Sequence, residues 1–93
     1  MRLLYLFRFQ QIGETFLGAA VGPNAHLFNG VLQLNEVGHF IVSELAKLPE
    51  SSENNIILQL TDSLTKEYAV DCSTAQSAVQ SVLDYLKTEQ VLA

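Results

Sequence analysis

Apolar and polar positions alternate along the first third of the chain. In YLFRFQQI, residues 5–12, three aromatic residues alternate with Leu6, Arg8 and Gln10. A period of two with aromatic residues predicts a half-buried strand. Gly13 and Glu14 are a turn signal, so TFLGAAV, residues 15–21, is expected to complete a hairpin.

A third short strand is expected at Val31–Leu34, after two turn signals. The first signal is Gly22, Pro23 and Asn24, and the second is Asn29 with Gly30, residue types that tolerate positive φ.

The pattern then changes to a helical period. Asn35 is a candidate N-cap, Glu36 suits the positive end of a helix, and Pro49 marks its end. The residues between them form one apolar stripe: Val37, Phe40, Ile41, Leu45 and Leu48. We expect a helix over 36–48, followed by a polar linker at 51–55.

Two more helices follow in the pattern. One stripe comprises Ile57, Leu60, Leu64 and Tyr68. Ser73 and Gln76 have the spacing of a capping box, and the next stripe comprises Ala75, Val79, Val82, Leu83 and Leu86. Three strands followed by three helices predict a single α+β domain over residues 1–93, with a β region at 1–34 and a helical region at 35–93.

Charge argues against nucleic acid as a partner. The 93 residues carry ten acidic and five basic side chains, a net charge of −5. Residues 1–48 are balanced, whereas residues 49–93 contain two basic and seven acidic side chains. A phosphate-binding surface needs the opposite sign.

Neither a membrane span nor a disulfide framework is predicted. The one long uncharged run, residues 15–35, is interrupted by Gly18, Gly22, Pro23 and Gly30, among others. Cys72 is the one cysteine, which is typical of a reducing compartment, so we expect a cytoplasmic protein. Its expected role is that of a small, half-buried apolar residue.

No arrangement typical of an enzyme is present in the sequence. His26 and His39 lack the i, i+4 spacing of metal ligands, and His39 is expected at the surface or rim of a helix. The serines have no histidine in register, and the acidic residues are unpaired along the chain. We therefore expect a non-enzymatic protein without a cofactor or metal.

The segment GVLQL, residues 30–34, contains no charge, lysine or proline that would block strand pairing. It could be an internal strand of the sheet or an open edge that accepts a partner strand, and the residue pattern favours neither.

The order of motifs resembles the family of pyrroloquinoline quinone biosynthesis protein D, which recognises the leaders of ribosomally made, modified peptides. The resemblance rests on LNEVGHFI at 34–41, EYAVD at 67–71, and the last-helix positions Ala75, Val79, Leu83, Leu86 and Leu92. The chain departs from the family at Ala78, where the family has an acidic residue, and at Gln90, where it has glycine.

This resemblance implies a winged helix-turn-helix-like fold and peptide binding by strand addition. The implied docking residues are Val31, Leu32, Gln33 and Leu34 on the third strand, and Ala78, Val82 and Tyr85 on the third helix. For Val82 and Tyr85, ordinary core packing is an equally simple interpretation. The absence of an acid at Ala78 implies a more apolar leader peptide.

The implied function is that of a peptide chaperone. It would hold a precursor's leader and present it to a maturation enzyme, often a radical S-adenosylmethionine protein in that family. Two alternatives stay open: a winged-helix DNA-binding regulator, and a homodimerisation module that pairs through the same edge.

Overall fold

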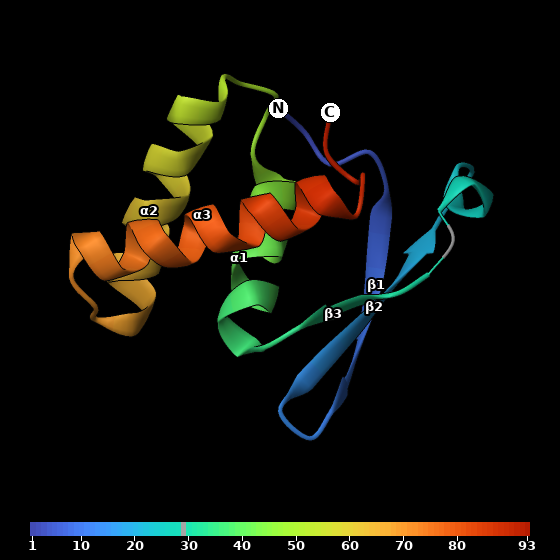
Figure 1. Cartoon of the computed structure of the whole chain (residues 1–93), viewed down its shortest axis with the longest axis horizontal. Helices are drawn as coiled ribbons and strands as arrows, with labels where there is room; N and C mark the ends of the chain where they lie inside the picture. Colours follow the sequence, from blue (N-terminus) through green and yellow to red (C-terminus); the bar gives the residue numbers. More distant parts are fainter. Residues whose placement is uncertain (29) are drawn as a thin grey trace.

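A computed structural model describes residues 1–28 and 30–93. Three strands precede three helices along the chain, with one short 3₁₀ helix between the second and third strands (Figure 1). Their bounds are β1 Leu6–Ile12, β2 Thr15–Val21, η1 Ala25–Leu27, β3 Leu32–Leu34, α1 Glu36–Lys47, α2 Glu53–Tyr68 and α3 Cys72–Thr88. The α+β prediction is confirmed. The 3₁₀ helix was not foreseen, and the expected turn residue Asn29 lies outside the described residues.

The strands form an antiparallel sheet in the order β1-β2-β3. β3 is therefore an edge strand, so the interpretation of residues 30–34 as an internal strand is wrong. The β1–β2 hairpin closes between Ile12 and Thr15, and Gly13 in its turn has φ +64°. Glycine at the first central position fits the type II′ turn favoured by two-residue hairpins.

The inner face of the sheet is aromatic. Phe9 lies opposite Gly18 in the register, and a Cβ added to Gly18 would stand 2.5 Å from the Phe9 ring. Glycine at this position therefore lets the ring lie across β2. Leu32 and Leu34 extend the same face and are buried, whereas Leu6 and Ile12 are exposed on the outer face.

The first helix begins as predicted. The Asn35 side chain accepts a hydrogen bond from the Gly38 N–H at 2.8 Å, and the C-cap is Leu48, just before Pro49. The cap fixes the point at which β3 turns into α1, because strand and helix share this residue as their boundary.

The starts of α2 and α3 correct two predictions. The polar linker expected at 51–55 is wrong: Ser52 caps α2, its hydroxyl accepting from the Asn55 N–H, and Ile56 rather than Ile57 enters the core. The capping box of Ser73 and Gln76 is also wrong, because Asp71 caps α3 by accepting from the Thr74 N–H.

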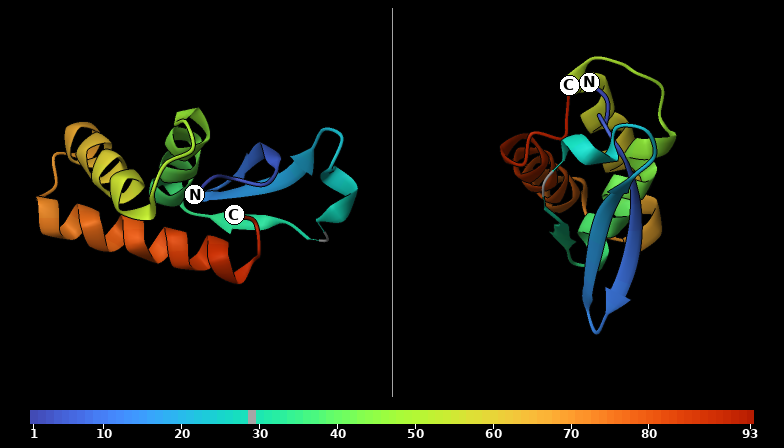
Figure 2. Two further views of the ribbon diagram at one scale, coloured as in Figure 1. Left: turned by 90° about the horizontal axis from the view of Figure 1, so that it is seen from above. Right: turned by 90° about the vertical axis from the view of Figure 1, so that its right-hand side faces the viewer.

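The helices form a layer beside the sheet. α3 lies across α1 and α2 and ends next to β3, with the sheet on the α1 side (Figures 1 and 2). One core joins both parts, and its buried members are Leu32, Leu34, Ile41, Val42, Leu45, Ile56, Leu60, Leu64, Ala75, Val79, Leu83, Leu86 and Val91.

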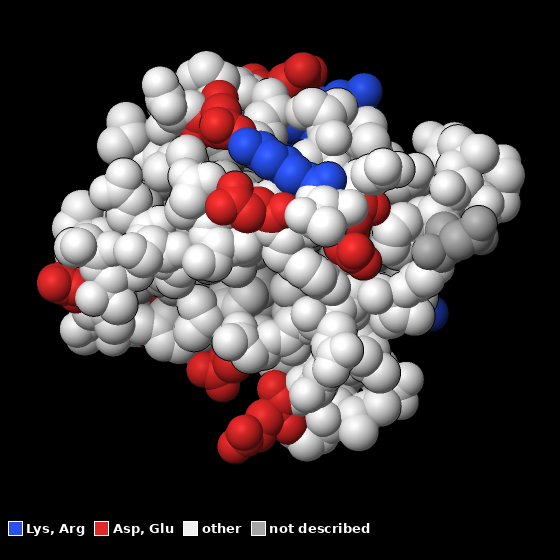
Figure 3. All heavy atoms as spheres, viewed as in Figure 1, with Lys and Arg blue, Asp and Glu red and all other residues white. Residues whose placement is uncertain are grey.

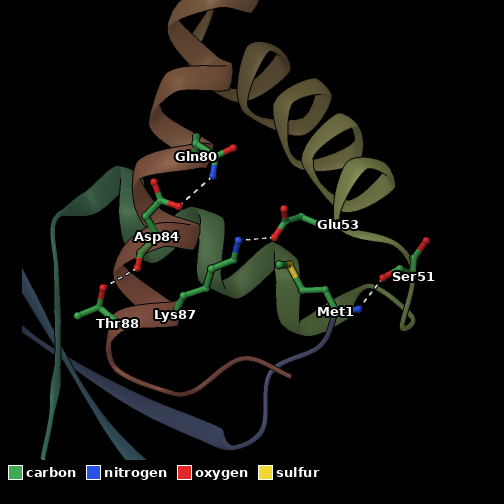
Figure 4. A network of polar contacts seen from close by, with 7 residues as sticks. All are labelled: Met1, Ser51, Glu53, Gln80, Asp84, Lys87 and Thr88. Atoms are coloured by element: carbon green, nitrogen blue, oxygen red, sulfur yellow. Dashed lines mark hydrogen bonds and ion pairs between the residues drawn. The ribbon is translucent and has the colours of Figure 1, made fainter.

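The two ends of the chain pair with each other. Arg2 and Ala93 exchange two main-chain hydrogen bonds, and the Leu4 N–H donates to the Val91 carbonyl at 2.8 Å. The Met1 ammonium donates to the Ser51 carbonyl at 2.6 Å (Figure 4). This pairing ties the segment that follows α3 to the segment that leads into β1.

Among the described helices, none combines the length and the apolar character needed to cross a membrane.

Candidate functional site

The free edge of β3 faces the C-terminal half of α3. The Gln33 N–H donates to the Tyr85 hydroxyl at 2.9 Å. In an antiparallel strand the main-chain groups of successive residues point to opposite edges. Gln33 therefore directs its N–H and C=O away from β2, while the flanking residues direct theirs toward β2. A side-chain oxygen occupies the place that a neighbouring strand's carbonyl would otherwise take.

A pocket of about 390 Å³ lies at this contact. Five residues from four segments line it: Thr15, Gln33, Leu34, Asn35 and Tyr85. Its position is set by local structure, since Asn35 caps α1 and the register places β2 beside β3. The pocket is a concave site at the end of a strand edge, with hydroxyl and amide groups at its rim.

The structure brings together three of the seven residues predicted from the sequence: Gln33, Leu34 and Tyr85. Ala78 and Val82 are half-buried against the core and do not line this pocket, nor does Val31, which is exposed. Of the three docking residues expected on α3, the pocket thus includes only Tyr85, near the C-terminal end of the helix.

Leu32 and Leu34 differ from the other candidates because their side chains belong to the core. Leu32 is 0% exposed and Leu34 is 6% exposed. They pair with Gly18 and Phe16 of β2. Neither their side chains nor their main-chain hydrogen bonds are free for a partner, so Gln33 is the β3 residue that presents the edge.

The sequence did not single out Thr15 or Asn35 as a site residue, and it named Asn35 as a cap and as part of the motif at 34–41. Asn35 carries a detectable signal, because a cap placed between a strand and a helix must lie where the two elements meet. Thr15 carries no such signal. It reaches the pocket through the pairing of β2 with β3, which the sequence does not reveal.

The α3 helix carries one acidic and one basic side chain, Asp84 and Lys87, and the basic one is paired. Lys87 forms an ion pair with Glu53 of α2, and Gln80 donates to Asp84 at 3.0 Å (Figure 4). The hydrogen bond with Glu53 raises the pKa of Lys87. Figure 3 shows the basic side chain over α3 lying between acidic ones. The cation is thus already neutralised within the protein.

His39 is half-buried on α1 and packs against the aromatic face of the sheet. Its ring stacks on Phe16 with centroids 4.1 Å apart and meets Phe9 edge-on at 4.8 Å. Burial lowers the pKa of His39, because the protonated form loses hydration. His26 lies exposed in η1. The described part of the chain holds no group of three or more His, Cys, Asp or Glu side chains placed to bind a metal ion.

Cys72 corrects a further prediction. It is exposed at the first residue of α3 instead of half-buried. The reason is the helix start, since a residue directly after the Asp71 cap lies in the open first turn.

No family model matches this chain, and no match was found among curated proteins or solved structures. The resemblance described above therefore stays a prediction.

Proposed function

We propose that this protein is a non-enzymatic peptide chaperone that binds the leader of a ribosomally made precursor by strand addition at β3. The observation that carries the proposal is the outward Gln33 N–H, which is held by the Tyr85 hydroxyl and not by another strand. A strand edge that is not paired with another strand can accept a guest polypeptide through main-chain hydrogen bonds.

Binding exchanges one hydrogen bond for two. A carbonyl of the incoming peptide takes the Gln33 N–H in place of the Tyr85 hydroxyl, and a peptide N–H donates to the outward Gln33 carbonyl. The displaced hydroxyl then faces the pocket that it shares with Thr15 and Asn35. The main-chain bonds give affinity, and the pocket selects the neighbouring side chain of the peptide.

The chaperone role follows from this mode of binding. A held leader keeps the precursor's core segment at high local concentration for a maturation enzyme, which in the resembling family is often a radical S-adenosylmethionine protein. We propose the cytoplasm as the site of action, where ribosomes make such precursors and where a single exposed thiol stays reduced.

The DNA-binding alternative is less well supported. A reading helix lies among phosphate contacts, yet the basic residue near the end of α3 is paired with Glu53. The polar positions before it are Gln76, Ser77, Gln80, Ser81 and Asp84. Such a surface carries little positive charge to bind the phosphates of a duplex.

The decisive experiment is a calorimetric titration with the leader region of a short precursor encoded beside this chain's gene. Gln33→Pro removes the outward N–H without removing a bond to β2, and proline is tolerated on an edge strand. We expect about tenfold weaker binding. Gln33→Ala is the matched control, since it removes the same side chain and keeps the amide.

Equal affinity of the proline and alanine variants, with circular dichroism unchanged, would exclude strand addition at Gln33. Tyr85→Phe tests the exchange step separately. It removes the competing hydroxyl, so the leader is expected to bind about threefold more tightly. Weaker binding would mean that the hydroxyl contacts the peptide directly.

A further inference from the structure

The second edge of the sheet, on β1, is longer than the first, and no described segment hydrogen-bonds to it. β1 spans seven residues, and its hairpin closes at the pair Ile12 and Thr15. A two-residue hairpin closes with a hydrogen-bonded pair, so even-numbered residues of β1 bond to β2 and odd-numbered residues point outward. The outward groups belong to Phe7, Phe9 and Gln11. Within the described chain, no main-chain or side-chain hydrogen bond meets their N–H or C=O groups.

An apolar cavity lies directly beneath this edge. Its volume is about 610 Å³, and it separates β1 and residues 2–5 from the C-terminal half of α1. Helix α1 packs over β2 and β3, and the cavity separates it from β1. Phe7 and Phe9 line the cavity and are only half-buried. An added strand would therefore find main-chain groups at the edge and room for side chains below it.

The residues of β1 are arranged symmetrically about Phe9. Leu6 and Ile12, three positions away on either side, are large apolar residues that are 67% and 56% exposed. Arg8 and Gln10 flank Phe9 more closely on the same outer face. When two copies of β1 pair antiparallel with Phe9 opposite Phe9, each Leu6 lies beside Ile12 of the second copy, and each Arg8 lies beside its Gln10.

This register also satisfies the main chain. Phe9 pairs with its own copy, and Phe7 pairs with Gln11 of the second copy on both sides, so each outward N–H meets a carbonyl. The same symmetry turns both aromatic inner faces toward the two cavities. No other register brings Leu6 and Ile12 together.

Charge permits this pairing. Residues 1–48 are balanced, and the excess of acidic side chains belongs to residues 49–93, which form α2, α3 and their connections. The net charge of −5 thus belongs to residues 49–93, and Glu50, the acidic residue of that part that lines the cavity beneath β1, forms an ion pair with Arg2 at 3.8 Å. We propose that the protein forms a two-fold symmetric dimer through β1, giving a continuous six-stranded sheet centred on Phe9.

Sedimentation equilibrium tests the proposal. The wild-type chain of 10.3 kDa should reach twice that mass in the micromolar range. Leu6→Glu with Ile12→Glu places like charges opposite one another at both ends and should weaken the dimer at least about tenfold. Leu6→Lys with Ile12→Glu places opposite charges in the same two positions, so the dimer should be recovered. Leu27→Glu with Leu58→Glu adds two charges at other exposed sites and should change nothing.

Three results would overturn the proposal. The first is a monomer throughout the micromolar range for the wild-type chain. The second is equal weakening by both β1 double variants, which would exclude this register. The third is loss of the dimer in Gln33→Pro, which would assign self-association to β3. Leader binding by the Leu6→Glu, Ile12→Glu variant is expected to be unchanged, because the leader is proposed to bind at β3. A negative result for the dimer therefore does not bear on the peptide-binding proposal, which the Gln33→Pro titration tests.

Discussion

Each edge of the sheet has outward main-chain groups that do not bond to a neighbouring strand, and the two edges differ in how these groups are covered. On β3 the outward N–H of Gln33 finds the Tyr85 hydroxyl, since the end of α3 lies alongside the strand. On β1 the nearest helix, α1, does not reach the edge, and a cavity of about 610 Å³ lies between the helix and the strand. A helix close to a strand edge can satisfy it with a side chain. A helix further away leaves the main-chain groups of the edge unpaired and a cavity beneath the strand.

The comparison separates two kinds of binding edge. β3 is short, and its inner side chains are fixed in the core, so its one outward residue suits a guest held beside a small polar pocket. β1 is longer, and its exposed apolar residues suit a partner that covers the whole strand. An uncovered strand edge is a template for pairing with another chain.

The largest expected effect concerns how much the side chains of each edge strand contribute to the free energy of unfolding. Leu32→Ala on β3 removes a side chain that is 0% exposed and should lower the free energy of unfolding by about 3 kcal/mol. Leu6→Ala on β1 removes an exposed side chain and should change it by less than about 0.5 kcal/mol. Urea denaturation of dilute, monomeric protein measures both. Similar losses would mean that the two strands are anchored alike.

A smaller effect is expected at the end of β3. Asn35→Ala removes the oxygen that accepts from the Gly38 N–H, and should lower the free energy of unfolding by about 1 kcal/mol. Asn24→Ala is the control, because the Asn24 side chain makes no capping hydrogen bond to η1. Equal changes in both variants, measured by urea denaturation, would contradict a specific role for the cap.

The cover over β3 can be measured directly by amide hydrogen exchange. Tyr85→Phe should speed exchange at the Gln33 amide and lower stability by roughly 0.5 kcal/mol, since one partly exposed hydrogen bond is lost. Exchange at Phe9 and Gln11 of β1 should be the same in both proteins at equal concentration. An unchanged Gln33 rate would show that the hydroxyl does not protect this edge.

The smallest expected effect is a pH dependence at the aromatic face that joins β1 and β2 to α1. Burial lowers the pKa of His39 from 6.5, so the unfolded state binds the proton more readily. Stability is then complete above the unfolded pKa and falls as the pH drops through the folded one. Urea midpoints between about pH 7.5 and pH 5 should decline more in wild type than in His39→Gln. A gain on acidification would mean that stacking on the protonated ring outweighs its desolvation.

The sequence predicted the elements well wherever a local signal was unambiguous. The alternation around Phe7 and Phe9, the glycine turn and the Asn35 cap each act within a few residues, and all three are confirmed. It failed where two local signals overlapped. Asp71 and Ser73 are both good caps, and nothing in the pattern shows that Asp71 would be used.

The start of α2 failed for a related reason. Glu53, Asn54 and Asn55 have the polarity of a linker, yet they form the exposed first turn of a helix capped by Ser52. A polar first turn and a polar loop look alike in sequence, because both face water.

The sequence by itself determined the order of the three strands and three helices, the apolar stripes of the helices, and which half of the chain is acidic. Only the tertiary structure decided that β3 lies at an edge, that Tyr85 reaches Gln33 across 52 residues of sequence, and that β1 overhangs a cavity. Periodicity and capping depend on neighbours along the chain. The two candidate sites depend on where packing of the shared core leaves α3 and α1 relative to each edge, and a one-dimensional pattern does not encode that distance.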